Sequence, residues 1–214
     1  MASKRALGVR QLWGTLRRRM TSLGQRVYWD VRDIFSRPRE VLESGAVRFR
    51  VLFVCFGNVC RSPLAEEIFR RKVAKAGLAG VVGIDSAATS AWNIGKRPHW
   101  KARACAARHG LALGHLRARL LTPSDLDRFD RILVMDQRNL QDVLGLAPQP
   151  QVAARVRLLL DFAGGGEIPD PIHGEAADFE RVFCQIDGAC DGLLTTVAQE
   201  IERRTATTAV RTRL

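Results

Sequence analysis

Residues 50–63 read Arg-Val-Leu-Phe-Val-Cys-Phe-Gly-Asn-Val-Cys-Arg-Ser-Pro, and this stretch decides the fold. The apolar run at 50–55 is typical of a buried parallel strand. The segment at 62–77 predicts a helix, with Ser62 as its N-cap and Pro63 at its first position. A strand therefore passes through a tight loop directly into the start of a helix.

The alternation of strand and helix continues along the rest of the chain. Strands that alternate with helices predict a parallel sheet covered on both faces. The predicted fold class is α/β, a four-stranded parallel sheet with helices on both faces, plus an N-terminal basic helical extension. The further strands are expected at 81–86, 131–136 and 156–162, and the further helices at 98–109, 137–144 and 175–203.

Length and composition narrow the class of protein. The chain has 214 residues, of which 46% are hydrophobic and 26% charged, which excludes a fully disordered chain. No fixed repeat period recurs, so collagen-like and repeat architectures are excluded as well. No run of 18 apolar residues occurs, and we therefore expect no transmembrane helix.

The basic character belongs mainly to the N-terminus. Residues 1–50 hold 12 Lys or Arg and 4 Asp or Glu, whereas residues 51–214 hold 22 and 18. Between Val9 and Ile34 the apolar residues recur at helical spacing, and arginines fill much of the remainder. Three interpretations stay open: a helix packed on the domain or a partly disordered arm, a basic amphipathic helix on an anionic membrane surface, and a transit peptide.

The sequence suggests three parts, a basic amphipathic extension at 1–48, a domain at 49–204 and a flexible tail at 205–214. Five cysteines without a secretory signal indicate free thiols in a reducing, cytoplasmic compartment. No CxxC pair occurs, which argues against a structural zinc site. The cysteines that we expect to be packing residues are Cys105, Cys184 and Cys190.

The loop after the first strand has the features of an anion site. Ligands of open α/β sheets bind at the carboxyl ends of the strands. A helix N-terminus there offers unpaired N–H groups and a partial positive charge. Gly57 and Asn58 suit the positive φ that a tight loop needs. The loop is therefore a candidate nest for a phosphate group.

Two side chains turn this nest into a candidate catalytic site. Arg61 can hold two phosphate oxygens with its planar guanidinium. Cys55 lies where the amides, the helix dipole and Arg61 all favour the thiolate, and the Ser62 hydroxyl can donate to it. A thiolate that faces a bound phosphate is arranged for in-line displacement, and the same donors stabilise the transition state.

The nonapeptide Cys-Phe-Gly-Asn-Val-Cys-Arg-Ser-Pro at 55–63 resembles the signature of low-molecular-weight protein tyrosine phosphatases. The similarity extends over about residues 50–204, through the segments 84–95, 122–140 and 168–180. It implies hydrolysis of protein phosphotyrosine through a phosphocysteine on Cys55, without metal or cofactor, and possible bacterial tyrosine kinase substrates. Seven signature positions match: Cys55, Gly57, Asn58, Cys60, Arg61, Ser62 and Pro63.

The resemblance also implies roles for residues outside the nucleophile and the arginine. Asp170, between two prolines, matches the general acid that protonates the leaving group and then activates water. Cys60 matches a second thiol that pairs with the nucleophile under oxidation. The remaining implied residues are Phe56, Gly57, Asn58, Val59, Cys60 and Ser62 in the phosphate-binding loop, Ser86 and His115 as supports of that loop, and Trp92 on the substrate rim.

The chain departs from the family pattern at two places. Ile172 and His173 stand at the rim where the family has one or two tyrosines, which makes the preference for phosphotyrosine less secure. Tyr28 is the only tyrosine, so regulatory phosphorylation of the family's tyrosines has no counterpart. His-Trp-Lys at 99–101 replaces Asp-Pro-Arg, and we expect this to alter a helix start and not the chemistry.

Two other functions compete with phosphatase activity. An arsenate reductase of the same fold would need distal cysteines near the third strand, and residues 135–143 contain none. A non-catalytic, membrane-recruited anion-binding adaptor would fit the basic extension and the altered rim. Against it, the nucleophile, the arginine and the acid are all present. We expect a cytoplasmic phosphatase that can bind an anionic membrane surface through residues 1–40 and does not bind nucleic acid.

Overall fold

The computed structural model describes residues 48–146 and 149–211. The extension predicted at 1–48 therefore lies outside the described residues, apart from Arg48. Among the helices of the described part, none combines the length and the apolar character needed to cross a membrane.

Four parallel strands form the central sheet: β1 (Phe49–Cys55), β2 (Val82–Ala88), β3 (Arg131–Val134) and β4 (Val156–Leu158). Their order is β2-β1-β3-β4, so the chain moves outward from β1 first in one direction and then in the other. The crevice at such a reversal, outside the carboxyl ends of the strands, is where open α/β sheets bind ligands. Cys55 is the last residue of β1 and lies at this edge.

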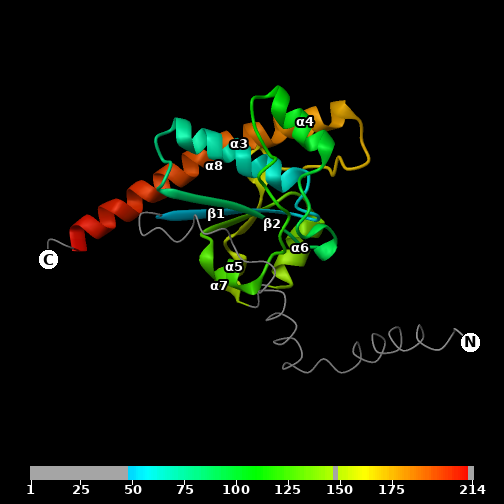
Figure 1. The fold of residues 1–214 in the computed structure, drawn as a ribbon. Helices are drawn as coiled ribbons and strands as arrows, with labels where there is room; N and C mark the ends of the chain where they lie inside the picture. The colour runs from blue at the N-terminus through cyan, green and yellow to red at the C-terminus, as the bar shows by residue number, and fades with distance from the viewer. Residues whose placement is uncertain (1–47, 147–148, 212–214) are drawn as a thin grey trace, which may run out of the picture. The chain divides into compact units, whose positions relative to one another are not determined.

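Helices cover both faces of the sheet (Figure 1), as the sequence predicted. Successive residues of β1 point to opposite faces, so Phe53 joins one apolar cluster and Leu52 the other. One face carries α3 (Arg61–Lys75), α4 (Trp100–Arg108) and α8 (Ala176–Arg211), and the other carries α5 (Pro123–Arg128), α6 (Gln137–Leu144) and α7 (Pro150–Ala153). The 3₁₀ helices are η2 (Ala91–Asn93) and η3 (Leu159–Ala163).

The fourth strand is shorter than expected. The apolar run predicted a strand at 156–162, but β4 ends at Leu158 and the chain continues as η3. Leu159 and Leu160 are still buried in that turn. An apolar run indicates burial, and it does not distinguish a strand from a tight helical turn.

The last helix is longer than expected. Residues 205–211, which were predicted as part of a flexible tail, continue α8. Thr205 explains part of this extension, because its hydroxyl accepts a hydrogen bond from the Arg48 guanidinium at 2.8 Å and donates to the Ile201 carbonyl at 2.8 Å. Arg204 forms an ion pair with Asp130 at 2.9 Å and so ties the same turn to the end of the sheet.

Candidate active site

The loop between β1 and α3 contains one residue with a positive φ, Asn58, and one glycine, Gly57, that lies close to the Asn93 side chain. Asn58 has a φ of 50°, in the left-handed region that asparagine tolerates better than most residues. Gly57 does not have a positive φ, contrary to expectation. A Cβ at this position would lie 2.8 Å from Nδ2 of Asn93, so the Asn93 side chain would have to move to admit a larger residue.

The helix begins two residues earlier than predicted, and this changes the role of Ser62. Cys60 occupies the N-cap position of α3, so the Ser62 hydroxyl does not cap the helix. Its Oγ lies 3.0 Å from the Cys55 Sγ and accepts a hydrogen bond from Nδ2 of Asn58 at 2.9 Å. The Asn58 backbone N–H approaches the same sulfur at 3.3 Å. The Cys55 sulfur thus lies against one amide and one hydroxyl.

Arg61 is buried beneath this loop between two carboxylates. Its Nη1 donates to Asp136 Oδ2 at 2.5 Å and to the Ile168 carbonyl at 2.9 Å, and its Nη2 donates to Asp170 Oδ2 at 2.8 Å. Burial opposes the charged guanidinium, but Cys55, Asp170 and Asp136 together raise the pKa of Arg61. Its Nε is buried and has no hydrogen-bond partner among the described residues.

The two carboxylates come from different elements that the sheet order brings together. Asp136 follows β3 and is the N-cap of α6, where its Oδ1 accepts from the Asn139 N–H at 2.7 Å. Asp170 lies in the loop before α8, and the Ile168 N–H docks that loop on the Met135 carbonyl at 2.8 Å. The sequence interpretation missed Asp136. The available signal was an aspartate at the carboxyl end of a strand followed by a helix.

Asn58 also connects the phosphate loop to its surroundings. Its Nδ2 donates to Ser86 Oγ at 2.8 Å, and that hydroxyl donates to Glu66 Oε2 at 2.6 Å. The Asn58 Oδ1 accepts from the Arg119 backbone N–H at 3.0 Å. Ser86 on β2 thus contacts the loop residue Asn58 directly, and Glu66 and Arg119 belong to the same hydrogen-bond network.

Arg119 is the centre of a buried ion cluster that the sequence did not reveal. Its Nε donates to Asp85 at 3.0 Å, and its two Nη atoms bind both oxygens of Asp125 at 2.8 and 3.1 Å. Burial opposes the charge, whereas the two aspartates raise the pKa of Arg119. Asp125 belongs to a capping box with Thr122 at the start of α5. That capping pattern is visible in the sequence, but its arginine partner is not.

The structure does not bring His115 to the phosphate loop. Its side chain is 59% exposed, and its Nε2 lies 3.3 Å from Glu67 Oε1 on α3. The loop residue Asn58 is held by the backbone N–H of Arg119, not by His115.

The rim of the loop is aromatic. Trp92 in η2 is 79% exposed and meets the Phe56 ring edge-on, with ring centroids 6.0 Å apart. The guanidinium of Arg138 lies 5.0 Å from the centre of the same Phe56 ring. Ile172 is partly buried against the apolar core, and its N–H donates to Asp170 Oδ1 at 3.3 Å. His173 is exposed, and Val59 in the loop is partly buried against the core.

The described part contains all five cysteines, and all of them are free thiols. Burial, then Cys55 and Asp170, raise the pKa of the Cys60 thiol. Cys105 and Cys190 are buried, in agreement with a packing role. Cys184 is exposed, so the expectation that it packs in the core was wrong. Its position on α8 turns the side chain outward, which the helical spacing alone did not settle.

The fold and site define an α/β protein with a cysteine and an arginine at one helix N-terminus, placed at the reversal of strand order. A family model described as low molecular weight phosphotyrosine protein phosphatase matches residues 50–204. The chain therefore belongs to the low-molecular-weight phosphotyrosine protein phosphatase family, whose members are hydrolases that act on phosphoproteins.

Individual relatives agree with this assignment. A low molecular weight protein-tyrosine-phosphatase of Streptomyces coelicolor is 40% identical over 163 residues, which are 74% of this chain and 99% of the relative. The human low molecular weight phosphotyrosine protein phosphatase is 40% identical over 147 residues, 67% of this chain and 92% of the relative.

Solved structures show the same fold. A protein tyrosine phosphatase from Entamoeba histolytica, with Hepes in its active site, has a TM-score of 0.68 at 29% identity. The match covers 71% of this chain and 98% of that one. YfkJ from Bacillus subtilis has a TM-score of 0.65 at 35% identity, over 71% of this chain and 96% of its own.

Proposed function

We propose that this protein hydrolyses phosphotyrosine in proteins through a phosphocysteine intermediate on Cys55. The observation that carries the proposal is the environment of one sulfur atom. The Cys55 Sγ lies within hydrogen-bond distance of the Asn58 N–H and the Ser62 hydroxyl, directly before the N-terminus of α3. Helix N-termini stabilise anions, and both a thiolate and a phosphate are anions.

Arg61 would exchange partners when phosphate binds. Its Nε is a buried donor without a partner among the described residues, and its Nη2 is held by Asp170. A phosphate dianion offers oxygens for both positions and competes with the Asp170 carboxylate for the guanidinium. Substrate binding therefore frees Asp170 from its ion pair and allows it to carry the proton that the leaving group needs.

The reaction then has two balanced steps. The Cys55 sulfur attacks phosphorus, the bond from phosphorus to the tyrosyl oxygen breaks, and Asp170 transfers its proton to that oxygen. In the second step a water oxygen attacks phosphorus, the phosphorus–sulfur bond breaks, and the water proton passes to the Asp170 carboxylate. Inorganic phosphate leaves, and both residues return to their starting states.

Substitution of the nucleophile and of the arginine tests the mechanism. We expect Cys55→Ser to abolish hydrolysis of p-nitrophenyl phosphate. Arg61→Ala should abolish it too, and Arg61→Lys should lose most of it because an ammonium cannot replace the planar two-point contact. Cys190→Ala, at a cysteine of α8 outside the phosphate loop, serves as the control and should retain activity. Near-normal turnover by Cys55→Ser would refute the phosphocysteine route.

Asp170 is tested in the same assay by comparing leaving groups. Asp170→Asn should lower kcat for a phosphotyrosine peptide by about 10²- to 10⁴-fold, while phosphate binding is retained. The loss should be smaller for p-nitrophenyl phosphate, because its leaving group needs less protonation. The exposed Asp161→Asn is the matched control. Equal losses for both substrates would exclude Asp170 as the general acid.

The substrate class is decided by comparing phosphotyrosine, phosphoserine and phosphoarginine peptides with arsenate. Phosphoarginine is included because the solved structure of a drosophila arginine phosphatase is similar, with a TM-score of 0.64 at 31% identity. We expect preference for phosphotyrosine, since the exposed Trp92 ring and Phe56 provide an aromatic rim. Arsenate turnover with a thioredoxin system, and none with aryl phosphates, would favour a reductase instead.

A further inference from the structure

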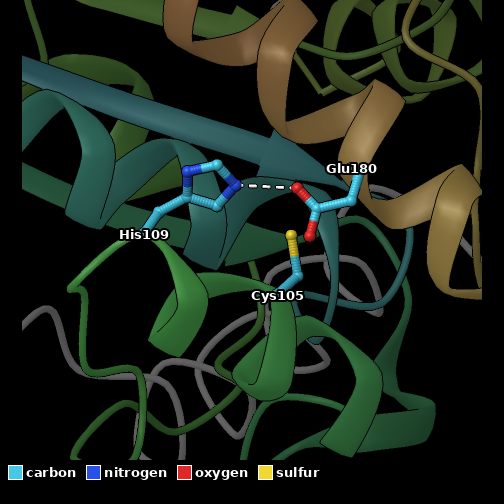
Figure 2. Close-up of side chains that lie close together, drawn as sticks. All are labelled: Cys105, His109 and Glu180. Atoms are coloured by element: carbon cyan, nitrogen blue, oxygen red, sulfur yellow. Dashed lines mark hydrogen bonds and ion pairs between the residues drawn. The ribbon is translucent and has the colours of Figure 1, made fainter.

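Three potential metal ligands meet outside the phosphate loop and outside the loop before α8 that carries Asp170, here called the acid loop. Figure 2 shows Cys105 on α4, His109 at the end of α4 and Glu180 on α8 with their side chains converging. One ligand atom from each residue lies within 4.8 Å of the others. Nothing in the proposed phosphatase chemistry uses these groups, so the cluster needs its own explanation.

The fold holds all three side chains in place. Cys105 and His109 are four residues apart, so they lie on one face of α4, and this helix packs on α8. The His109 ring stacks on Phe183, with centroids 3.7 Å apart and an interplanar angle of 11°. Arg108 donates to Glu180 Oε1, which leaves Oε2 facing His109 Nε2 at 2.7 Å.

We propose that Cys105, His109 and Glu180 bind a zinc ion, with Cys184 as the fourth ligand. A set of sulfur, imidazole and carboxylate donors suits Zn²⁺, whereas Mg²⁺ and Ca²⁺ prefer oxygen ligands alone. Cys184 follows Glu180 by four residues on α8 and is exposed, so its thiol is available on the same helix face.

Zinc binding requires small side-chain movements of Cys105, His109 and Glu180, whose ligand atoms already lie within 4.8 Å of one another, and requires the Cys184 thiol to turn toward them. In tetrahedral coordination the ligand atoms would lie about 3.3 Å apart, so the hydrogen bond between His109 and Glu180 must open slightly. Arg108 and Phe183 already orient the carboxylate and the ring, as outer contacts do around metal ligands. Cys105 gives up its S–H contact with the Phe179 carbonyl, at 3.5 Å, and releases its proton on binding.

The proposed zinc site lies next to the acid loop, where a bound ion would restrict the movement of that loop. Phe179 and Glu180 belong to the first turns of α8, directly after the loop that carries Asp170. Lys101 on α4 already donates to the Gly174 carbonyl at the end of that loop, at 2.7 Å. A metal ion between α4 and α8 adds a second connection at this place. Its main consequence is therefore greater resistance to unfolding.

Cobalt binding to the full-length chain tests the proposal. All variants are made in a parent chain that carries Cys55→Ser. This substitution removes the proposed nucleophilic thiol of the phosphate loop, so the metal-binding result does not depend on the proposed catalysis. Residues 1–47 contain neither cysteine nor histidine, so the extension cannot supply such ligands. We expect one Co²⁺ per chain with a thiolate-to-cobalt charge-transfer band, and displacement by Zn²⁺. Absence of stoichiometric binding would overturn the proposal.

Variants identify the ligands. Cys105→Ser and His109→Gln should each weaken binding by at least about 100-fold, the upper range seen for outer contacts alone. His109→Gln preserves a donor toward Glu180, and Glu180→Gln, at a partly exposed position, is the further variant if Cys105→Ser does not fold. The buried Cys190→Ala and the exposed His115→Asn are controls. Binding that survives in both ligand variants would overturn the site.

Two further readouts complete the test. Zn²⁺ at about 100 times its Kd should raise the Tm of the parent by about 5–10 °C, whereas Mg²⁺ should not. Cys184→Ser should weaken Co²⁺ binding at least about tenfold and reduce the charge-transfer intensity. Unchanged binding by Cys184→Ser would exclude Cys184 as a ligand, and an unchanged Tm would contradict a site that ties α4 to α8.

Discussion

The most informative single residue is Ser62, because its hydroxyl acts on the nucleophile and not on the helix. It accepts a hydrogen bond from the Asn58 side-chain amide, so its own O–H is available to donate to the Cys55 sulfur at 3.0 Å or to the Ala87 carbonyl at 3.4 Å. A hydroxyl that donates a hydrogen bond to the sulfur stabilises the sulfur most when the sulfur is negatively charged. The sulfur gains this charge when the phosphorus–sulfur bond breaks in the second step.

We therefore expect Ser62→Ala to lower kcat by about 10- to 100-fold, the effect of one hydrogen bond to a charged group. The phosphocysteine should accumulate, because its breakdown loses the stabilising donor. Rapid-quench measurement of the burst with p-nitrophenyl phosphate checks this. Ser124→Ala, near the start of α5 at a partly exposed position, is the control. A wild-type kcat without a burst would show that the hydroxyl does not act on the leaving sulfur.

At the scale of elements, the Arg119 cluster joins the middle of β2, the start of α5 and the phosphate loop. Arg119→Met would leave the carboxylates of Asp85 and Asp125 buried without their main counter-charge. We expect the free energy of unfolding to fall by about 3–5 kcal/mol, measured by urea denaturation. Arg117→Met is the matched control, since Arg117 is exposed. A loss similar to that of the control would mean that the cluster contributes little to stability.

The contact between α4 and α8 should be sensitive to acid. The hydrogen bond from His109, and then those from Arg108, lower the pKa of Glu180 in the folded chain. A carboxyl whose folded pKa is lowered stabilises the fold above its unfolded pKa of about 4.3, and this contribution is lost as the pH falls through the folded value.

In thermal melts with EDTA, the Tm of the wild type should exceed that of Glu180→Gln near neutral pH. The difference should shrink as the pH falls from about 5 to about 3. Glu167→Gln, at an exposed position, should show no such trend. A difference that does not change over this range would mean that the charge of Glu180 plays no part in holding the two helices together.

At the scale of the whole molecule, most of the net positive charge lies at the N-terminus, since residues 1–50 have 12 basic and 4 acidic side chains. We expect the full chain to sediment with vesicles that contain phosphatidylserine, at least about tenfold more strongly than a chain starting at residue 47. Added salt should weaken the binding, and neutral vesicles are the control. Equal binding by the two chains would exclude the extension as a membrane anchor.

The amino-acid sequence determined the part of the site that is contiguous. The strand, the loop and the helix start fall within residues 50–63, so the positions of Cys55 and Arg61 follow from local backbone preferences. Regular alternation of apolar segments determined the sheet class in the same way. Asp170 was proposed as the general acid by resemblance, and the structure places its carboxylate in an ion pair with Arg61.

Only the tertiary structure decided which distant residues meet. Asp136 reaches Arg61 because β3 lies beside β1, Arg119 is buried because two aspartates from separate segments surround it, and the ligands Cys105 and Glu180 belong to helices far apart in the chain. Apolar periodicity says which face of an element is buried, but not which element covers it. Strand order and helix packing settle that, because they depend on the whole core at once.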